Sequence, residues 1–190
     1  MKNPKFLPIE FSPQKGKFTN LQLVPAAAQL LYTNRFTLFD AFFQISETNK
    51  IEKTIELIEH TAPAFWAITD PQTGALAGIA YLYDWIGDGE TCFSAKVSTC
   101  FARKYWGKFA KRAGKLFFRY VFAKYRPHRV CAEVYEHNAY PKSLLAALGF
   151  VYEYTRPNAT LSNLGATSVL GYAINNPKCS LNPHKSAKSQ

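Results

Sequence analysis

Three apolar segments follow one another in the middle of the chain with no helical segment between them. They cover residues 64–69, 75–84 and 91–101, and turn residues at 70–74 and 87–89 separate them. Turns of this composition join neighbouring antiparallel strands, so we expect the three segments to pair in that way. A purely parallel, doubly wound sheet would alternate strands with helices throughout, and this order excludes it.

Beyond these strands the chain alternates between helix and strand. Residues 109–125 carry apolar side chains on one helical face and mostly basic side chains on the other, as in an amphipathic helix, and Pro127 closes it. The other expected elements are a strand at 129–135, a short helix at 141–148, and strands at 150–155 and 168–174. The order predicts an α/β fold with a mixed sheet.

The N-terminal third is expected to supply one strand and two helices. Residues 18–24 alternate in hydropathy and stop at a proline, which indicates a strand. Apolar residues recur at helical spacing over 26–43. A second amphipathic helix is expected from Ile51, with Thr48 or Asn49 as its N-terminal cap.

The length of 190 residues suits one domain. We expect an irregular lead-in at 1–16, a domain at 17–175 and a polar, basic tail at 176–190. No apolar run approaches the roughly 20 residues of a membrane span, and no secretory signal is visible, so we expect a cytoplasmic protein. The four cysteines lack metal-ligand spacing, which predicts reduced thiols and no metal site.

The charge balance favours an anionic partner. The chain has 23 basic and 13 acidic residues, a formal net charge of +10. Nucleic acid is one candidate partner and a cofactor with several phosphates is another, while a solvated basic surface is the alternative explanation. Because no zinc knuckle, helix-turn-helix pattern or RNA-binding motif is visible, the nucleic-acid hypothesis rests on charge and aromatic content alone.

A glycine and several basic residues lie between a predicted strand and the long predicted helix. Unpaired N–H groups at a helix N-terminus, together with the helix dipole, attract a diphosphate. Gly107 would let the backbone approach such a group closely. The run Arg103–Ala110 resembles the phosphate-binding loop of the GNAT acetyltransferase superfamily, with Lys104 and Gly107 at family positions and Phe109 where glycine or alanine is usual.

Further segments resemble the same superfamily in the same order. Residues 129–138 are similar to its fifth strand, which ends in an asparagine, and a Gly-Phe pair at 149–150 follows at the usual interval. Residues 21–25 resemble its first strand. The phosphate loop and residues 153–156 look most like the branch of ribosomal-protein N-terminal acetyltransferases, although Tyr154 stands where that branch has glycine.

The resemblance implies a fold and an activity. The fold would be a mixed, mostly antiparallel sheet of about seven strands with about four flanking helices, splayed between strands four and five. The activity would be direct transfer of an acetyl group from acetyl-CoA to a primary amine. The residues expected to bind acetyl-CoA are Cys100, Phe101, Lys104, Trp106, Gly107, Lys108, Phe109, Ala110, Lys111 and Asn138.

Acetyl transfer needs a neutral amine, a polarised carbonyl and, for the departing thiolate, a proton. Glu136 and His137 lie near the end of the fifth strand and are the candidate bases. Tyr140 is the candidate catalytic residue in the segment that follows. Pro141 and Leu145 occupy the places where family members often carry serine and tyrosine, so the acid stays unassigned.

Several alternatives stay open. Asn138 could instead cap the short helix, and Asp84, Glu90 and Glu133 are further candidate bases. A domain that binds an acyl-CoA without turnover is the alternative to an enzyme, and Phe109 is one departure that supports it. The acceptor, a protein N-terminus or a small-molecule amine, and the oligomeric state, a homodimer among the options, carry no motif.

Overall fold

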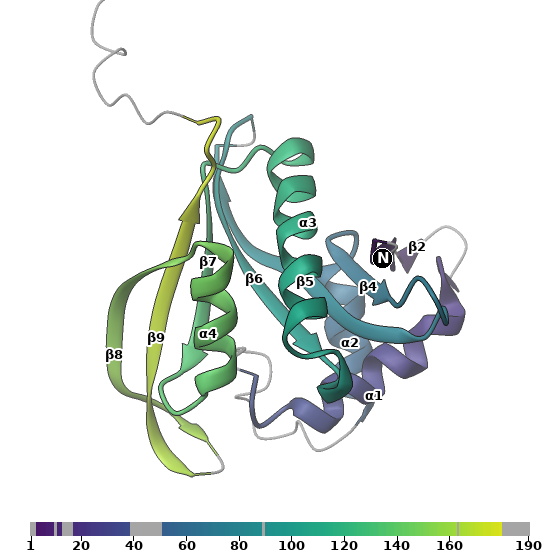
Figure 1. The fold of residues 1–190 in the computed structure, drawn as a ribbon, viewed down its shortest axis with the longest axis horizontal. Coiled ribbons are helices and arrows are strands. Elements are labelled where there is room, and N and C mark those ends of the chain that lie inside the picture. Colours follow the sequence, from purple (N-terminus) through teal and green to yellow (C-terminus); the bar gives the residue numbers. More distant parts are fainter. Residues whose placement is uncertain are drawn as a thin grey trace, which may run out of the picture.

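A computed structural model of the protein describes residues 3–9, 11–12, 17–38, 51–88, 90–162 and 164–179. Its centre is a seven-stranded sheet in the order β1-β4-β5-β6-β7-β9-β8 (Figure 1). Neighbouring strands run antiparallel except β6 and β7, which run parallel. The strands are β1 (Lys5–Pro8), β4 (Phe65–Thr69), β5 (Leu76–Gly87), β6 (Cys92–Phe101), β7 (Arg129–Tyr135), β8 (Val151–Ser162) and β9 (Gly165–Asn175).

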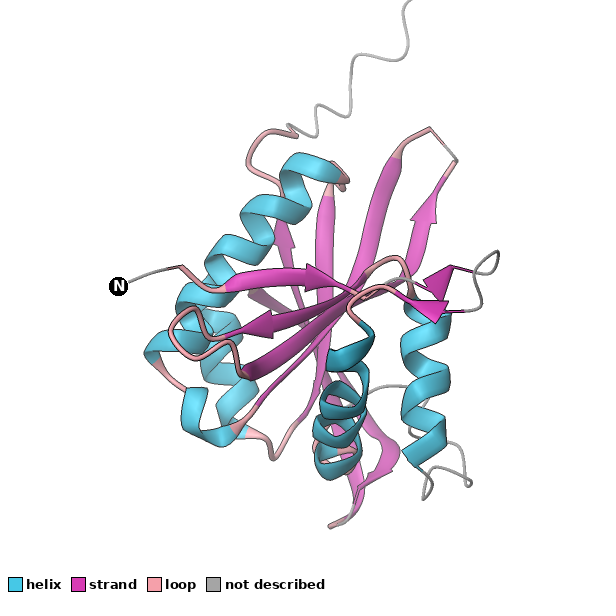
Figure 2. Cartoon of the chain, turned by 90° about the vertical axis from the view of Figure 1, so that its right-hand side faces the viewer, coloured by secondary structure: helices cyan, strands magenta, loops and turns pink. Residues whose placement is uncertain are grey.

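Two pairs of helices cover the two faces of this sheet (Figure 2). On one face lie α1 (Val24–Asn34) and α2 (Ile51–Thr61), and on the other lie α3 (Lys108–Lys124) and α4 (Ala139–Leu148). A small separate sheet pairs β2 (Phe11–Ser12) with β3 (Lys17–Phe18). No helix in the described part of the chain is long and apolar enough to cross a membrane.

The amphipathic pattern of α3 positions it on the sheet. Ala110, Ala113, Phe117 and Val121 recur every three or four residues and are at most 1% exposed. They pack with Trp66 and other sheet residues into the core on this face. Burying such a continuous apolar stripe fixes the helix axis along the sheet, so the N-terminus of α3 is held at the end of β6.

Most predicted elements are confirmed, as is the predicted fold class of a mixed sheet with four helices. The three consecutive central strands form β4, β5 and β6, and the strand predicted at 129–135 has the same bounds as β7. The amphipathic segment at 109–125 forms α3, and the helix predicted at 141–148 begins two residues earlier. Strands β8 and β9 extend the predictions at 150–155 and 168–174.

The predictions for the N-terminus were wrong in two places. Residues 18–24, expected to be a strand, contain a 3-10 turn, η1 (Leu21–Leu23), and the start of α1 at Val24. Pro25 lies in the first turn of α1, where its missing N–H costs no helical hydrogen bond. The lead-in at 1–16, expected to be irregular, contains edge strand β1, which pairs with β4.

The first helix is shorter than predicted. The pattern predicts a helix over 26–43, but α1 ends at Asn34, whose side chain donates a hydrogen bond to the carbonyl of Leu30 (2.8 Å). Residues 39–50, with the capping candidates Thr48 and Asn49, lie outside the described residues. The second helix does begin at Ile51, as predicted.

The parallel pair β6 and β7 opens into a splay. Strand pairing between them covers only three positions and ends at Lys96 opposite Cys131. Past that point β6 stays paired with β5 as far as Phe101, and β7 stays paired with β9 as far as Tyr135. In chain order these are strands four and five of the main sheet, so the predicted splay is confirmed.

Candidate functional site

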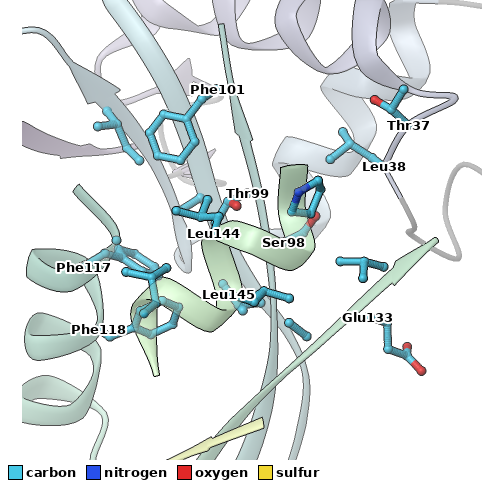
Figure 3. A pocket seen from close by; sticks show the side chains of 18 residues that line it. Thr37, Leu38, Ser98, Thr99, Phe101, Phe117, Phe118, Glu133, Leu144 and Leu145 are labelled. Atoms are coloured by element: carbon cyan, nitrogen blue, oxygen red, sulfur yellow. The ribbon is translucent and has the colours of Figure 1, made fainter. Parts of the chain in front are cut away.

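The splay between β6 and β7 holds an apolar cavity of about 70 Å³. Figure 3 shows Phe101, Phe117 and Phe118 on one side of it and Thr37 with Leu38 on the opposite side. Leu144 and Leu145 of α4 line it between these walls. A cavity that opens where two strands separate gives a ligand access to unpaired strand edges as well as to apolar side chains.

A second cavity of about 140 Å³ lies at the mouth of the splay. It shares wall residues with the first cavity, among them Thr99, Phe101 and Leu144. The residues predicted as site members that line it are Cys100, Phe101, Trp106, Asn138 and Tyr140. The structure therefore brings together residues from the end of β6, the following loop and the start of α4.

The loop that leads from β6 to α3 has the geometry expected of an anion site. A 3-10 turn, η3 (Arg103–Tyr105), precedes Gly107, which has φ +81° and ψ −122°. Only glycine adopts this conformation without strain, and an added Cβ would meet no atom within 4 Å. The first-turn N–H groups of α3 have no partner within the helix, and Lys104, Lys108 and Lys111 are exposed around them.

Phe109 does not obstruct this loop. Its ring is half-buried, packs against the core and lies 4.9 Å from the ring of Tyr105. The Tyr105 hydroxyl donates a hydrogen bond to Asp70 at 3.2 Å, which ties the loop to the turn between β4 and β5. Ala110 is fully buried, so neither its side chain nor its backbone is exposed. The departure from the family pattern at 109 therefore leaves the helix N-terminus open.

Asn138 contacts a distant segment instead of capping α4. It occupies the N-cap position, but its side chain makes no capping hydrogen bond. Its Nδ2 donates to the carbonyl oxygen of Thr37 at 3.0 Å, across 101 residues of sequence. This bond holds the segment after α1 at the mouth of the splay, where Thr37 and Leu38 line both cavities.

Glu136 and His137 lie away from both cavities. Neither is among the residues that line them, and both side chains are exposed. His137 Nδ1 lies 3.2 Å from Thr167 Oγ1 and its ring stacks on Tyr135, while the Glu136 carbonyl accepts a hydrogen bond from Lys142. Their role as bases stays a prediction.

Glu133 is an acidic residue that lines the splay cavity, and its carboxylate is held by a polar network. Its side chain is only 5% exposed and points away from the cavity centre in Figure 3. Tyr154 and Arg156 each donate to Oε1 at 2.6 Å, and Lys96 Nζ lies 3.0 Å from Oε2. Lys96 also pairs with Asp84 at 3.1 Å.

The pKa values of Tyr154 and Lys96 are both raised in this network. Burial, together with the adjacent Glu133 carboxylate, raises the pKa of Tyr154 to about 12, so the phenol stays a donor. Burial by itself lowers the pKa of Lys96, but its hydrogen bonds to Glu133 and Asp84 outweigh that effect and raise it. Glu133 is thus fixed by three donors at neutral pH.

Replacing Glu133 with glutamine is expected to lower the free energy of unfolding by about 1 kcal/mol, because two cations lose a shared partner in a partly solvated setting. Lys96 and Arg156 are 33% and 49% exposed, so water screens much of the loss. Glu153→Gln is the control, since Glu153 is 38% exposed and, among the described residues, forms an ion pair only with Arg129. Equal denaturant midpoints for the two variants would contradict the network's role.

Cys100 has a buried thiol at the mouth of the splay. Burial raises its pKa to about 12, so it stays protonated at neutral pH and is a poor nucleophile. The described residues contain no group of three or more histidine, cysteine or acidic side chains placed to hold a metal ion.

Sequence reasoning missed the residues that close the splay from the opposite side. Thr37 and Leu38 follow α1 and reach the cavities through the Asn138 contact. Pro141 and Leu144 of α4 complete the wall. No local pattern marks Thr37 or Leu38, because their role depends on a contact between segments about 100 residues apart.

Comparisons with known proteins agree with this geometry. The family model for the acetyltransferase (GNAT) domain matches residues 26–151. The ribosomal-protein-S5-alanine acetyltransferase from Vibrio fischeri has a similar structure, with a TM-score of 0.68, 17% identity, and coverage of 94% of this chain and 96% of that chain. No curated protein matches this chain in sequence.

A second similar structure is spermidine N-acetyltransferase from Vibrio cholerae, solved with CoA and spermine, with a TM-score of 0.70 and 18% identity. The alignment covers 92% of this chain and 96% of the spermidine N-acetyltransferase chain. An acetyltransferase of the GNAT family from Bacillus anthracis is also similar, with a TM-score of 0.68 and 15% identity. That alignment covers 92% of this chain and 96% of the Bacillus anthracis chain. At these identities the likeness concerns the fold, whereas the family model covers most of the chain. The chain belongs to the GNAT acetyltransferase family.

Proposed function

We propose that this protein transfers an acetyl group from acetyl-CoA to a primary amine by direct transfer. The observation that carries the proposal is the continuity of the site: an open helix N-terminus at Gly107, a mouth cavity beside it and a deeper cavity between two separated strands. An elongated cofactor with phosphates at one end and a thioester at the other matches this sequence of environments.

The residues present fit acetyl-CoA. The N–H groups at the start of α3, with Lys104, Lys108 and Lys111 around them, suit the phosphates. Past Lys96, the edge of β6 that faces β7 has no strand partner in the described part of the chain and suits an extended amide-bearing arm. Bound acetyl-CoA would supply the acetyl group as an activated thioester.

The acceptor would approach from the sheet face that carries Glu133, opposite the face covered by α3 and α4. Its ammonium must lose a proton before it can attack. Our candidates for the base that accepts this proton, directly or through water, are Glu136 and His137 at the end of β7. Leu145 is buried where a proton donor is common in the family, so we propose that the thiol leaves without a dedicated acid.

The similar structures support an amine acceptor. One is named for an alanine of ribosomal protein S5 and another for spermidine. Both acceptors are amines, although one belongs to a protein and the other to a small polycation. All four cysteines of this chain are free thiols, which is consistent with a cytoplasmic location.

The test is a calorimetric titration with CoA and acetyl-CoA, followed by measurement of free thiol release with an amine panel. The panel should contain peptides with free N-termini, a lysine-containing peptide with a blocked N-terminus, and spermidine. We expect micromolar CoA binding and amine-dependent thiol release with one class. Binding without thiol release would replace the enzyme by an acyl-CoA-binding domain, and the absence of binding would refute both.

A further inference from the structure

We propose that Tyr140 is a binding residue for the cofactor diphosphate, held in place by Trp106, and not the catalytic acid. This inference rests on the proposed function, because it assigns a role toward acetyl-CoA. It is carried by three features: the stack between the two rings, the buried hydroxyl of Tyr140, and the position of Tyr140 at the mouth of the splay.

The two rings join the phosphate loop to α4. The ring centroids of Trp106 and Tyr140 lie 4.0 Å apart with an interplanar angle of 11°. Trp106 Nε1 donates to the carbonyl oxygen of Phe101 at 3.0 Å, which anchors the indole to the end of β6. The anchored Trp106 ring therefore fixes the orientation of the Tyr140 ring through this stack.

The Tyr140 hydroxyl oxygen is buried and makes no hydrogen bond of normal geometry to the described residues. A buried hydroxyl without an acceptor costs free energy, so an acceptor is expected when the site is filled. Burial raises the pKa of Tyr140, although the nearby backbone N–H of Gly107 lowers it in part. The phenol thus stays protonated and can donate to an anionic oxygen held at Gly107.

The position of Tyr140 separates it from the reacting end of the site. It lines the mouth cavity with Trp106, whereas neither residue lines the deeper cavity between β6 and β7. Gly107, whose amide lies beside the Tyr140 hydroxyl, is the N-cap of α3. A donor beside that amide would add a hydrogen bond to the same phosphate oxygens that the helix N-terminus attracts.

The decisive variant is Tyr140→Phe, which keeps the ring and the stack and removes only the hydroxyl. We expect the Kd for CoA to rise about tenfold, because a hydrogen bond to a charged group is lost. Turnover at saturating acetyl-CoA should stay within about twofold of the parent. The melting temperature without CoA should fall little, since the hydroxyl makes no hydrogen bond of normal geometry to the described residues. Tyr120→Phe, at an exposed tyrosine of α3, is the control and should change nothing.

A second pair of variants tests the stack. Trp106→Leu should also weaken CoA binding, whereas Trp85→Leu should not, although both indoles are 43% exposed. An unchanged CoA affinity in Tyr140→Phe, or a large fall in turnover at unchanged affinity, would overturn the inference, the latter by pointing to a catalytic role for the hydroxyl. If the parent protein does not bind CoA, the proposed function itself fails.

Discussion

Replacing Gly107 with aspartate is expected to raise the Kd for CoA by about 100-fold, because it removes charge-assisted hydrogen bonds worth about 3 kcal/mol. Gly107 lies in a region of φ and ψ that is strained for any side chain, so the loop must shift to accept the substitution. The new carboxylate would also accept hydrogen bonds from the N–H groups in the first turn of α3. It would therefore compete with the phosphates for these donors. Calorimetric titration of both proteins with CoA measures the difference.

The control for this experiment is Gly165→Asp in the hairpin between β8 and β9. Gly165 also has a positive φ, +97°, and an added Cβ would likewise meet no atom within 4 Å. It therefore carries a comparable backbone strain and the same added charge in the β8–β9 hairpin, which β7 separates from β6 in the sheet order. Equal CoA affinities for Gly107→Asp and the parent would place the phosphates elsewhere and remove the basis of the proposed function.

The central fold could be predicted because its signals are local. The apolar runs of β4, β5 and β6 are bounded by turn residues, and α3 shows its buried stripe directly in the sequence. The loop that we propose binds the phosphates is also a local feature, since Gly107 and the neighbouring basic residues lie within one short segment. A structural requirement that a few adjacent residues satisfy leaves a pattern in the chain.

The N-terminal elements could not be predicted in this way. The run Leu21–Val24 is too short to separate strand from helix by its period, and the neighbouring proline fits either a strand end or a first helical turn. Strand β1 contains Pro8 and follows Pro4, and two prolines so close together in the sequence predict an irregular segment. At the edge of a sheet, however, prolines are tolerated because one side of the strand needs no hydrogen-bond donor.

Much of the candidate site depends on contacts between distant segments. The stack of Trp106 on Tyr140, and the bond from Asn138 to Thr37, join elements that are separate in sequence. The same holds for Glu133, which was one base candidate among several until its three donors from other strands were visible. Such pairings depend on the splay and on strand register, which composition and periodicity do not determine.

A cross-strand pair beside the Glu133 network yields the second large expected effect. Gly171→Ala should lower the free energy of unfolding by about 2–3 kcal/mol, the usual cost of forcing atoms into filled space. A Cβ on Gly171 would overlap the Tyr154 ring, which must then leave its place. That movement would also break the Tyr154–Glu133 hydrogen bond. Chemical denaturation measures the loss, and the melting temperature should fall by about 5–10 °C.

The same geometry predicts that the cost depends on Tyr154. In a Tyr154→Gly background the ring is absent, so Gly171→Ala should be close to neutral, since alanine is no worse than glycine within a strand. The coupling between the two positions should therefore be about 2–3 kcal/mol in a double-mutant cycle. Tyr152→Gly is the matched background, because Tyr152 is on the same strand but packs on Tyr172. If Gly171→Ala cost the same in all three backgrounds, the Tyr154 ring would not be what requires glycine at 171, and the register that lets Tyr154 reach Glu133 would have to be revised.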